Sequence, residues 1–508
     1  MASCPRRAAG NDGNPALVIQ LFTVTFGRQS MAPSILTAAR ADMFQGEREL
    51  AIWWVGFALL FGLYFLAWWM HLRPGVFSYD SGHFLQEVLT GDITNRKPFL
   101  YARFIELTSL GGRFFPLTLF AQAAIIVAFL SRIFAMAFSG RAHPISIALG
   151  AILVLNPYVA NMVFYVQNDV LFCFAIIAIL AETVWVCRRG HASLISWVII
   201  AVASPMAFAF RENGLLFLPV WCLLVAVFLG RDGRVLAGVA IVTTVVVYGI
   251  ASLGVDRSRT ADLMFPAVIH EVARLAQGGY RHEVGSRLSN ETREVVGDER
   301  LRSAARIYWP LYWDTVGFFR DGPNLGYLPQ DQRTRIVRSF LRHDLAPNLP
   351  SVAGHRVEML AGALLARAEH VDPYTAPDNL HGPLKVWKDR QGLAYRGKGW
   401  LGQLNEVSAR SRSWTWNAAL GVAVLMVITL VALWRRDRVT LIAAALLWLQ
   451  LGVVLAVAPS AEYRYVFMLY LAPLILLAGD PLSRFDSNTR PLARGLTTAH
   501  GQARSART

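Results

Sequence analysis

Charged side chains stand at four separate places where long apolar runs begin or end. Asp80 follows the first run, Asp169 opens a later one, Arg211 lies in a tight turn between two more, and Arg464 opens the last. A carboxylate at such a boundary can take a proton from a hydroxyl group, and positioned general bases contribute roughly 10²–10⁴-fold to a rate. An arginine offers fork-like hydrogen bonds to phosphate. Together these residue types suit chemistry on an anionic lipid headgroup.

The segment after the first apolar run is predicted to form a helix with two different faces. Helical spacing places Asp80, His83 and Glu87 on one face. The opposite face carries only apolar side chains: Phe84, Leu85, Val88 and Leu89. We expect such a helix to lie on the membrane surface, with its acidic edge toward protein or water, and to stop at Gly91.

Further polar residues accompany these positions and are taken as supporting members of the same candidate site. They are Lys97 before Pro98, Asn168 beside Asp169, Asn213 in the turn after Arg211, and Glu462 beside Arg464. The proline at 98 suits a first helical position, so a second helix is expected after Lys97. Charges at membrane depth cost a few kcal/mol each, and they are usually paired or functional.

Each charged position also has a purely structural explanation. Asp80 or Asp169 could stabilise the N-terminus of a helix. Arg211 could extend its charge to the lipid headgroups, and Glu462 could simply pair with Arg464. The joint pattern favours a site, because ion carriers and proton pumps place their charges near the middle of the bilayer instead.

The composition is that of a membrane protein. Of 508 residues, 55% are apolar and 16% are charged, whereas soluble domains average about 45–50% and about 25%. This excludes a secreted domain, a cytosolic enzyme, a disordered chain and a fibrous one. The net charge of +15 comes largely from arginines in short loops beside apolar runs, so no nucleic-acid partner is expected.

We expect about ten membrane spans, since a bilayer core of about 30 Å needs about 20 apolar residues per helix. The runs lie near residues 51–72, 114–138, 143–157, 168–187, 192–210, 213–230, 235–255, 414–434, 439–458 and 463–480. Arginines fill alternate connections, which the positive-inside rule assigns to the cytoplasm. Both termini are therefore predicted to be cytoplasmic, and the four charged positions of the site share the outer boundary.

The expected fold is an all-α polytopic membrane protein with a small, mainly helical extracytoplasmic domain. Its predicted parts are a cytoplasmic tail (1–50), an N-terminal transmembrane module of about seven spans (51–255, with the first outer loop at 73–113), the outer domain (256–413), a C-terminal module of about three spans (414–480) and a second cytoplasmic tail (481–508). Periodicity predicts outer helices over Ala261–Gln277, Gln330–His343 and Ser351–Ala368.

Three other features of the chain bear on function. The aromatic run from Tyr308 to Asp314, followed by Phe318 and Phe319, could contact sugar rings or anchor the chain at the membrane interface. The scattered histidines of the outer segment show no metal-binding spacing. The acid within the fourth span, Glu182, is expected to pair with Arg188 or Arg189.

Four short motifs resemble those of a known superfamily. They are Pro74-Gly-x-Phe-Ser-x-Asp80, Asn168-Asp169, Arg211-x-Asn213-Gly214 and Glu462-x-Arg464-Tyr465. The motifs follow one another in this order over residues 74–465. With them, the chain resembles the glycosyltransferase-C (GT-C) superfamily of polytopic membrane glycosyltransferases, and most closely a bacterial branch of it.

The resemblance implies transfer of a hexose or pentose, with inversion, from a polyprenyl-phosphate donor. The acceptor would be a lipid, a glycan or a protein on the outer face of the bacterial inner membrane. Asp80 would be the base that deprotonates the acceptor hydroxyl. Arg211 and Arg464 would bind the donor phosphate, and Asp169 would shape the site as a second acid.

The first loop departs from the pattern of the superfamily in one respect. Many members carry an adjacent acidic pair there, whereas Asp80 is followed by Ser81. Glu87 or Asp92 could supply the second carboxylate. Some members need a divalent metal and many do not, so the resemblance leaves a metal open.

Other functions fit parts of the pattern. A polysaccharide polymerase or ligase would place its key histidine and arginine in a late outer loop, where His381-Gly382 stands. A transporter or flippase of lipid-linked sugars would show inverted repeats and broken helices, for which Ser204-Pro205 is the one indication. A non-catalytic membrane scaffold is a further alternative.

Overall fold

The computed structural model describes residues 33–73, 75–95, 97–260, 264–280, 288–319, 321–365, 367 and 399–478. The chain divides into two compact units, residues 1–49 and 50–508. Several residues singled out in the sequence lie outside the described ranges: Pro74, His282, His370, His381 and Gly382. The account below concerns the second unit.

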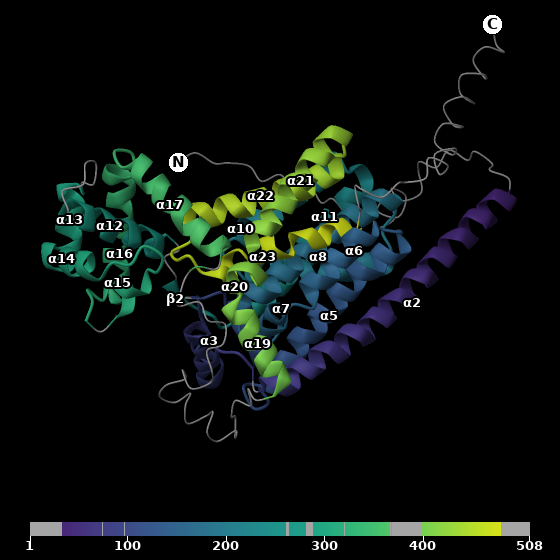
Figure 1. The fold of residues 1–508 in the computed structure, drawn as a ribbon, viewed down its shortest axis with the longest axis horizontal. Helices are drawn as coiled ribbons and strands as arrows, with labels where there is room; N and C mark the ends of the chain where they lie inside the picture. The colour runs from purple at the N-terminus through teal and green to yellow at the C-terminus, as the bar shows by residue number, and fades with distance from the viewer. Residues whose placement is uncertain are drawn as a thin grey trace, which may run out of the picture. The chain divides into compact units, whose positions relative to one another are not determined.

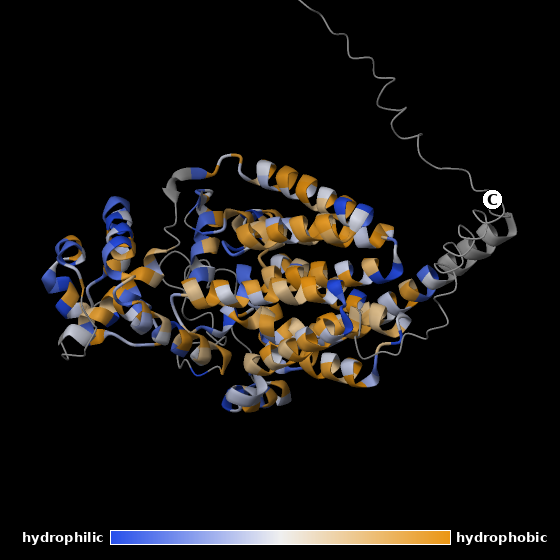
Figure 2. Ribbon diagram, turned by 90° about the horizontal axis from the view of Figure 1, so that it is seen from above, coloured by the Kyte–Doolittle hydropathy of each residue, from blue (hydrophilic) through white to orange (hydrophobic). Residues whose placement is uncertain are grey.

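Six described helices are long and apolar enough to cross a membrane. They are α2 (Pro33–Leu72, apolar from Gly46), α5 (Pro116–Ser139), α8 (Asn168–Arg189), α11 (Gly230–Ala251), α21 (Ala418–Arg435, preceded by α20, Arg412–Thr415) and α22 (Arg438–Val457). Hydrophobic residues cover the long helices, and hydrophilic residues collect toward their ends (Figure 2). The expectation of a helical protein with several helices able to cross a membrane is confirmed.

The other four predicted spans are also helical, but their helices are short or broken. Helices α6 (Pro144–Val154) and α7 (Pro157–Val163) are bent by 59° at their junction, where Pro157 cannot donate a backbone hydrogen bond. The remaining three are α9 (Leu194–Ala209), α10 (Gly214–Phe228) and the broken run α23 (Phe467–Leu471), η5 (Ala472–Leu474) and α24 (Ile475–Ala478). With the bent pair counted as one span the structure supports up to seven, so the count of ten stays a prediction.

Helix α8 forms the centre of the apolar bundle, and it packs against α5, α9, α22 and α23 (Figure 1). Its buried Glu182 accepts a hydrogen bond of 2.7 Å from Nε of Arg132, and both side chains are about 1% exposed. The predicted pairing with Arg188 or Arg189 is therefore wrong: Arg188 instead contacts Asp437 at 2.8 Å. Loss of one partner of such a pair typically costs about 3–5 kcal/mol, so this pair holds α5 to α8.

The segment between α2 and α5, predicted to be the first outer loop, contains the predicted pair of helices, α3 (Tyr79–Thr90) and α4 (Phe99–Thr108). Ser78 caps α3 through a capping box with Ser81, and α3 ends at Gly91, whose φ of 73° suits glycine. The expectation that the apolar face lies on the membrane is wrong. Phe84, Leu85 and Val88 are buried in the protein core, where α3 packs against α4. Leu89, at the end of the helix, is exposed.

Residues 256–413, called the outer segment after their predicted position, contain a second, separate hydrophobic core. The elements of this segment are β2 (Asp256–Thr260), α12 (Phe265–Tyr280), α13 (Asn290–Val296), α14 (Asp298–Ile307), α15 (Asp314–Phe318), η1 (Leu325–Tyr327), α16 (Gln330–Ser339), η2 (Phe340–Asp344), α17 (Leu349–Leu364) and α19 (Trp400–Arg410). Helices α12, α16 and α17 lie within a few residues of the three predicted ones. Strand β2 pairs in parallel with β1 (Thr94–Asn95) of the first loop.

Backbone contacts tie the outer segment to the connection that follows α22. The amide of Ala461 donates to the carbonyl of Leu311 at 2.9 Å, and the amide of Trp313 donates to Oγ of Ser460 at 3.2 Å. Arg356 of α17 donates to the carbonyl of Ala458 at 2.7 Å. The aromatic run is therefore held beside the segment that leads to Arg464.

Arg356 and His355 are themselves fixed by a buried carboxylate. Oε1 of Glu271 accepts from Nε of Arg356 at 2.9 Å and contacts Nδ1 of His355 at 2.7 Å. Burial alone would raise the pKa of Glu271, but its hydrogen bond with His355 and the nearby arginines hold that pKa at about 2. These side chains hold α12 and α17 together, which is a structural role.

The turn between α9 and α10 depends on Gly214. A methyl group at this position would collide with the backbone carbonyl oxygens of Ala207 and Phe208. We expect Gly214→Ala to destabilise the protein by about 1–3 kcal/mol, as overpacked sites do. Thermal unfolding in detergent, followed by tryptophan fluorescence, measures the loss.

The matched control is Gly238→Ala in α11, where an added methyl group meets no atom within 4 Å. This variant should unfold at or above the wild-type temperature. Equal unfolding temperatures for the two variants would contradict the packing of the turn described above.

Candidate functional site

Arg464 lies at the centre of a cluster of charges assembled from distant parts of the chain. Its Nη1 donates to Oδ2 of Asp80 at 2.7 Å. Its Nε forms an ion pair with Glu462 and lies 4.0 Å from Oδ2 of Asp169. One guanidinium thus reaches three carboxylates, in a side chain that is only 14% exposed.

Asp80 is held by three donors. In addition to Arg464, Nζ of Lys97 lies 2.8 Å from Oδ1, and Nε2 of Gln167 donates to Oδ2 at 3.1 Å. Burial alone would raise the pKa of Asp80, but the charges and hydrogen bonds of Lys97 and Arg464 hold it well below its ordinary value. Asp80 is therefore an ionised carboxylate at any pH near neutrality.

Asp169 and Arg211 form a second ion pair beside the first. The guanidinium of Arg211 lies over the ring of Tyr465, 4.6 Å from its centroid. Asp169 is only 3% exposed. Asn168 donates to the carbonyl of Phe210 and so fixes the start of α8 against the turn that carries Arg211.

Backbone hydrogen bonds bring the first loop to this place. The amide of Val76 donates to the carbonyl of Phe164 at 2.9 Å, and the amide of Val166 donates to the carbonyl of Val76 at 3.0 Å. Oγ of Ser81 then donates to the carbonyl of Val166 at 2.6 Å. The first turn of α3, which carries Asp80, is thereby fixed beside the start of α8.

The structure decides between several of the structural explanations considered above. Ser78, not Asp80, is the N-cap of α3, and Gln167, not Asp169, occupies that position in α8. Both acids lie in the first turn instead, where their charge is still favourable. The pairing of Glu462 with Arg464 is confirmed.

Three of the predicted site residues take other places. Oε1 of Glu87 accepts from the backbone amide and the hydroxyl of Thr94, so this acid fastens α3 to β1. Its role as a second carboxylate of the cluster stays a prediction. His83 is exposed on α3. Asn213 immediately precedes α10, where its backbone carbonyl accepts from Leu216 and Phe217.

Several members of the site were not expected from the sequence. Gln167 reaches Asp80, and Tyr465 stacks with both arginines. Asp314 of α15 lies within electrostatic reach of Glu462, Asp80 and Arg464. Gln167 and Tyr465 directly adjoin predicted residues, which is a usable signal. Asp314 ends the aromatic run considered for sugar contact, but nothing in that run indicates that this acid lies near the charged cluster.

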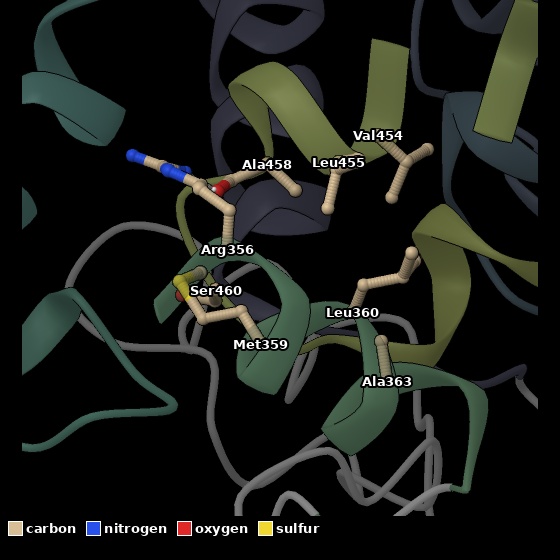
Figure 3. Close-up of a pocket in the computed structure, with 8 residues that line it drawn as sticks. All are labelled: Arg356, Met359, Leu360, Ala363, Val454, Leu455, Ala458 and Ser460. Atoms are coloured by element: carbon tan, nitrogen blue, oxygen red, sulfur yellow. Dashed lines mark hydrogen bonds between the residues drawn. The ribbon is translucent and has the colours of Figure 1, made fainter. Parts of the chain in front are cut away.

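A small pocket lies between α17 and the end of α22 (Figure 3). Its lining consists of Arg356, Met359, Leu360, Ala363, Val454, Leu455, Ala458 and Ser460. These side chains leave no room between them for a water molecule, so the pocket does not hold a lipid-linked sugar. Within the described ranges no group of three His, Cys, Asp or Glu side chains is arranged to hold a metal ion.

The chain matches no protein-family model, no curated protein and no solved structure. The resemblance to GT-C glycosyltransferases therefore depends on the four sequence motifs alone.

Lys97 offers a direct test of the charge cluster. In Lys97→Met, Asp80 loses one of its two cations, so its pKa should move up toward the ordinary value of about 3.9. A carboxylate with a depressed pKa stabilises the fold above its unfolded-state pKa, and that contribution disappears as the pH falls through the folded-state value. The variant should therefore lose about 1 kcal/mol near neutral pH, because Lys97 is partly exposed, and its acid unfolding should begin at higher pH.

Unfolding temperatures measured between about pH 3 and about pH 8 test this expectation. Arg410→Met is the matched control, because it breaks an ion pair with Glu406 in which both side chains are at least 70% exposed. The control should follow the wild-type profile. If Lys97→Met also followed it, Lys97 would not stabilise the Asp80 carboxylate.

Proposed function

We propose that the protein is an integral-membrane glycosyltransferase. It moves a hexose or pentose from a polyprenyl-phosphate donor to a lipid, glycan or protein acceptor, with inversion, at the outer face of a bacterial inner membrane. Both termini would then lie in the cytoplasm. The observation that carries the proposal is the contact of Arg464 with Asp80, Glu462 and Asp169 beside the ends of apolar helices.

The cations of the cluster suit the phosphate of such a donor. Arg211 and Arg464 present planar guanidinium groups, which recognise phosphate through paired hydrogen bonds. Lys97 is the most exposed of the three, at 38%. The apolar faces of the neighbouring helices would accept the polyprenyl chain, since that chain is as apolar as the lipid around it.

The reaction requires the protein mainly to position its two substrates and to stabilise the charge that develops on the phosphate. A polyprenyl phosphate leaves as a stable anion, so its departure needs no added proton. The enzyme must align donor and acceptor and stabilise charge on the departing phosphate. A carboxylate must also take the proton of the acceptor hydroxyl.

Asp80 is the carboxylate that the superfamily motif assigns to that task. Its ion pairs with Lys97 and Arg464 make it a weak base, because a carboxylate with a depressed pKa accepts a proton poorly. The same ion pairs give Asp80 a structural role in the site, because its carboxylate holds Lys97 and Arg464 next to each other. Loss of Asp80 should therefore abolish transfer through the geometry of the site, whichever group takes the proton.

A flippase or transporter of lipid-linked sugars is the second candidate. The bend between α6 and α7 and the prolines inside α9 and α10 favour it, because transporters use broken helices. It differs in its products: a flippase moves the donor across the membrane without cleaving it, whereas a transferase releases polyprenyl phosphate.

Asp80→Asn tests the proposed function. A neutral amide cannot hold both cations, so transfer should fall by at least about 10²-fold. The assay incubates membranes containing the variant with synthetic polyprenyl-phosphate hexose and pentose, and measures released polyprenyl phosphate by mass spectrometry. Asp298→Asn, at a side chain that is 70% exposed, is the control.

Asp80→Asn should lose its rate of transfer, and Asp298→Asn should keep it. Both variants should be present in the membrane in equal amounts. Near wild-type release by Asp80→Asn would contradict the proposed site. Donor translocation without release, in the wild type, would favour the flippase.

Reporter fusions test the proposed orientation. Gly190 follows α8 in an arginine-rich connection, and Gly322 lies in the outer segment. Alkaline phosphatase, which is active only outside the cytoplasm, should be active when fused at Gly322 and inactive at Gly190. Activity at both sites, or at neither, would contradict the arrangement of spans.

A further inference from the structure

We propose that helix α19 lies in the plane of the membrane interface, with one of its sides among the lipid acyl chains. The partner of this side is the lipid bilayer and not a second protein molecule. This placement does not depend on the proposed transferase function, because it follows from the contacts and the exposed surfaces of α19 itself.

The side of α19 that faces the protein is made of small and polar residues. Gly402, Asn405 and Ser408 are buried. Nδ2 of Asn161 in α7 donates to Oδ1 of Asn405 at 2.6 Å, and Nε1 of Trp416 donates to Oγ of Ser408 at 2.9 Å. A surface helix of a soluble protein packs its apolar stripe against the core. Helix α19 is instead attached to the protein by its polar side.

A second side of α19 is apolar and exposed. Helical spacing aligns Trp400, Leu404 and Val407, which are between 42% and 71% exposed. Trp414, seven residues after Val407, is 79% exposed. Soluble proteins rarely expose contiguous apolar surfaces unless these bind a partner or a membrane. This row of side chains, called the apolar row below, therefore needs an apolar partner.

A third side of α19 is polar and also exposed. It carries Gln403, Glu406 and Arg410, and Nη2 of Arg410 lies 3.4 Å from Oε2 of Glu406. Two exposed sides of opposite polarity, next to each other on one helix, are typical of a helix in a membrane interface. One of these sides contacts the acyl chains, while the other contacts lipid headgroups and water.

The place of α19 in the chain favours lipid over a second copy of the protein. Helices α20 and α21 follow directly, and residues 412–435 are long and apolar enough to cross a membrane. Helix α19 runs across the direction of the long apolar helix α2 (Figure 1). A helix that directly precedes a span lies where that span enters the bilayer, and tryptophans such as Trp400 and Trp414 are enriched at that level.

Ring contacts connect α19 to the charged cluster. The ring of Trp416, which holds Ser408, lies 4.4 Å from that of Tyr158, and Tyr158 lies 4.9 Å from Tyr463. Tyr463 directly precedes Arg464, and all three rings are buried. Because buried rings pack closely, the backbone at Arg464 keeps a fixed level relative to α19. The proposal therefore also places the charged cluster close to the level of the lipid headgroups.

Spin labels distinguish lipid from water along α19. The full chain is labelled at one introduced cysteine, with Cys4 and Cys187 replaced by alanine; Cys173 and Cys222 are buried and remain. Each variant is reconstituted in liposomes of phosphatidylethanolamine and phosphatidylglycerol. Power-saturation EPR then compares collisions of the label with oxygen, which dissolves in lipid, and with a water-soluble nickel chelate.

Leu404→Cys and Val407→Cys test the apolar row, and Gln403→Cys and Glu406→Cys are matched controls on the adjacent side of the same helix. The ratio of oxygen to nickel collisions should be several-fold higher in the apolar row than in the controls. The background protein without an introduced cysteine should carry no label. Unfolding temperatures close to that of the wild type show that each variant is folded, and Trp400→Cys replaces any variant of the row that is not.

Three outcomes would overturn the inference. Equal ratios in the apolar row and in the controls would show that the row faces water. Few collisions with either reagent would show that protein covers the row. Dipolar broadening of the spectra that disappears on dilution with unlabelled protein would identify that cover as a second copy of the chain.

Discussion

The side chain of Arg464 imposes the main constraint on this protein. A guanidinium with little exposure must be matched by negative charge, and here three carboxylates from three parts of the chain meet it. Each carboxylate belongs to a different segment: Asp80 to the first loop, Asp169 to the start of α8, and Glu462 to the connection after α22. The contacts of this one guanidinium therefore hold the three segments together.

Two further ion pairs neutralise the remaining charges of the cluster. Asp169 is matched by Arg211, which also stacks on Tyr465, and Asp80 is matched by Lys97. The result is a compensated cluster rather than a strongly positive or negative one. A phosphate that enters must compete with carboxylates for the same donors, so its binding and the rearrangement of Asp80 or Glu462 are linked events.

Much of this arrangement could be predicted from the sequence, and the reasons are physical. Hydropathy and the distribution of arginines predicted which ends of the spans share a side. This prediction grouped Asp80, Asp169, Arg211 and Arg464, which the structure brings into contact. Gly91 predicted where α3 ends, and Pro98 predicted where α4 begins. All of these signals are local, and the bilayer makes them stronger than they are in a soluble protein.

Other features depended on contacts that no local signal encodes. Glu182 pairs with Arg132 rather than with its neighbours in sequence, because α5 packs against α8 at that depth. The apolar face of α3 could equally have covered lipid or protein, and the structure places it against protein. Asp314 lies near the cluster only through the way in which the outer segment folds back, so composition and periodicity could not indicate it.

The bond from Arg356 to the carbonyl of Ala458 has a mechanical consequence. Arg356 belongs to α17 and is anchored by Glu271 of α12, while Ala458 ends the last long hydrophobic helix. Helices α12 and α17 are thus linked to the backbone that leads to Arg464. A molecule that moved α17 would therefore also displace that backbone, without contacting Arg464 itself.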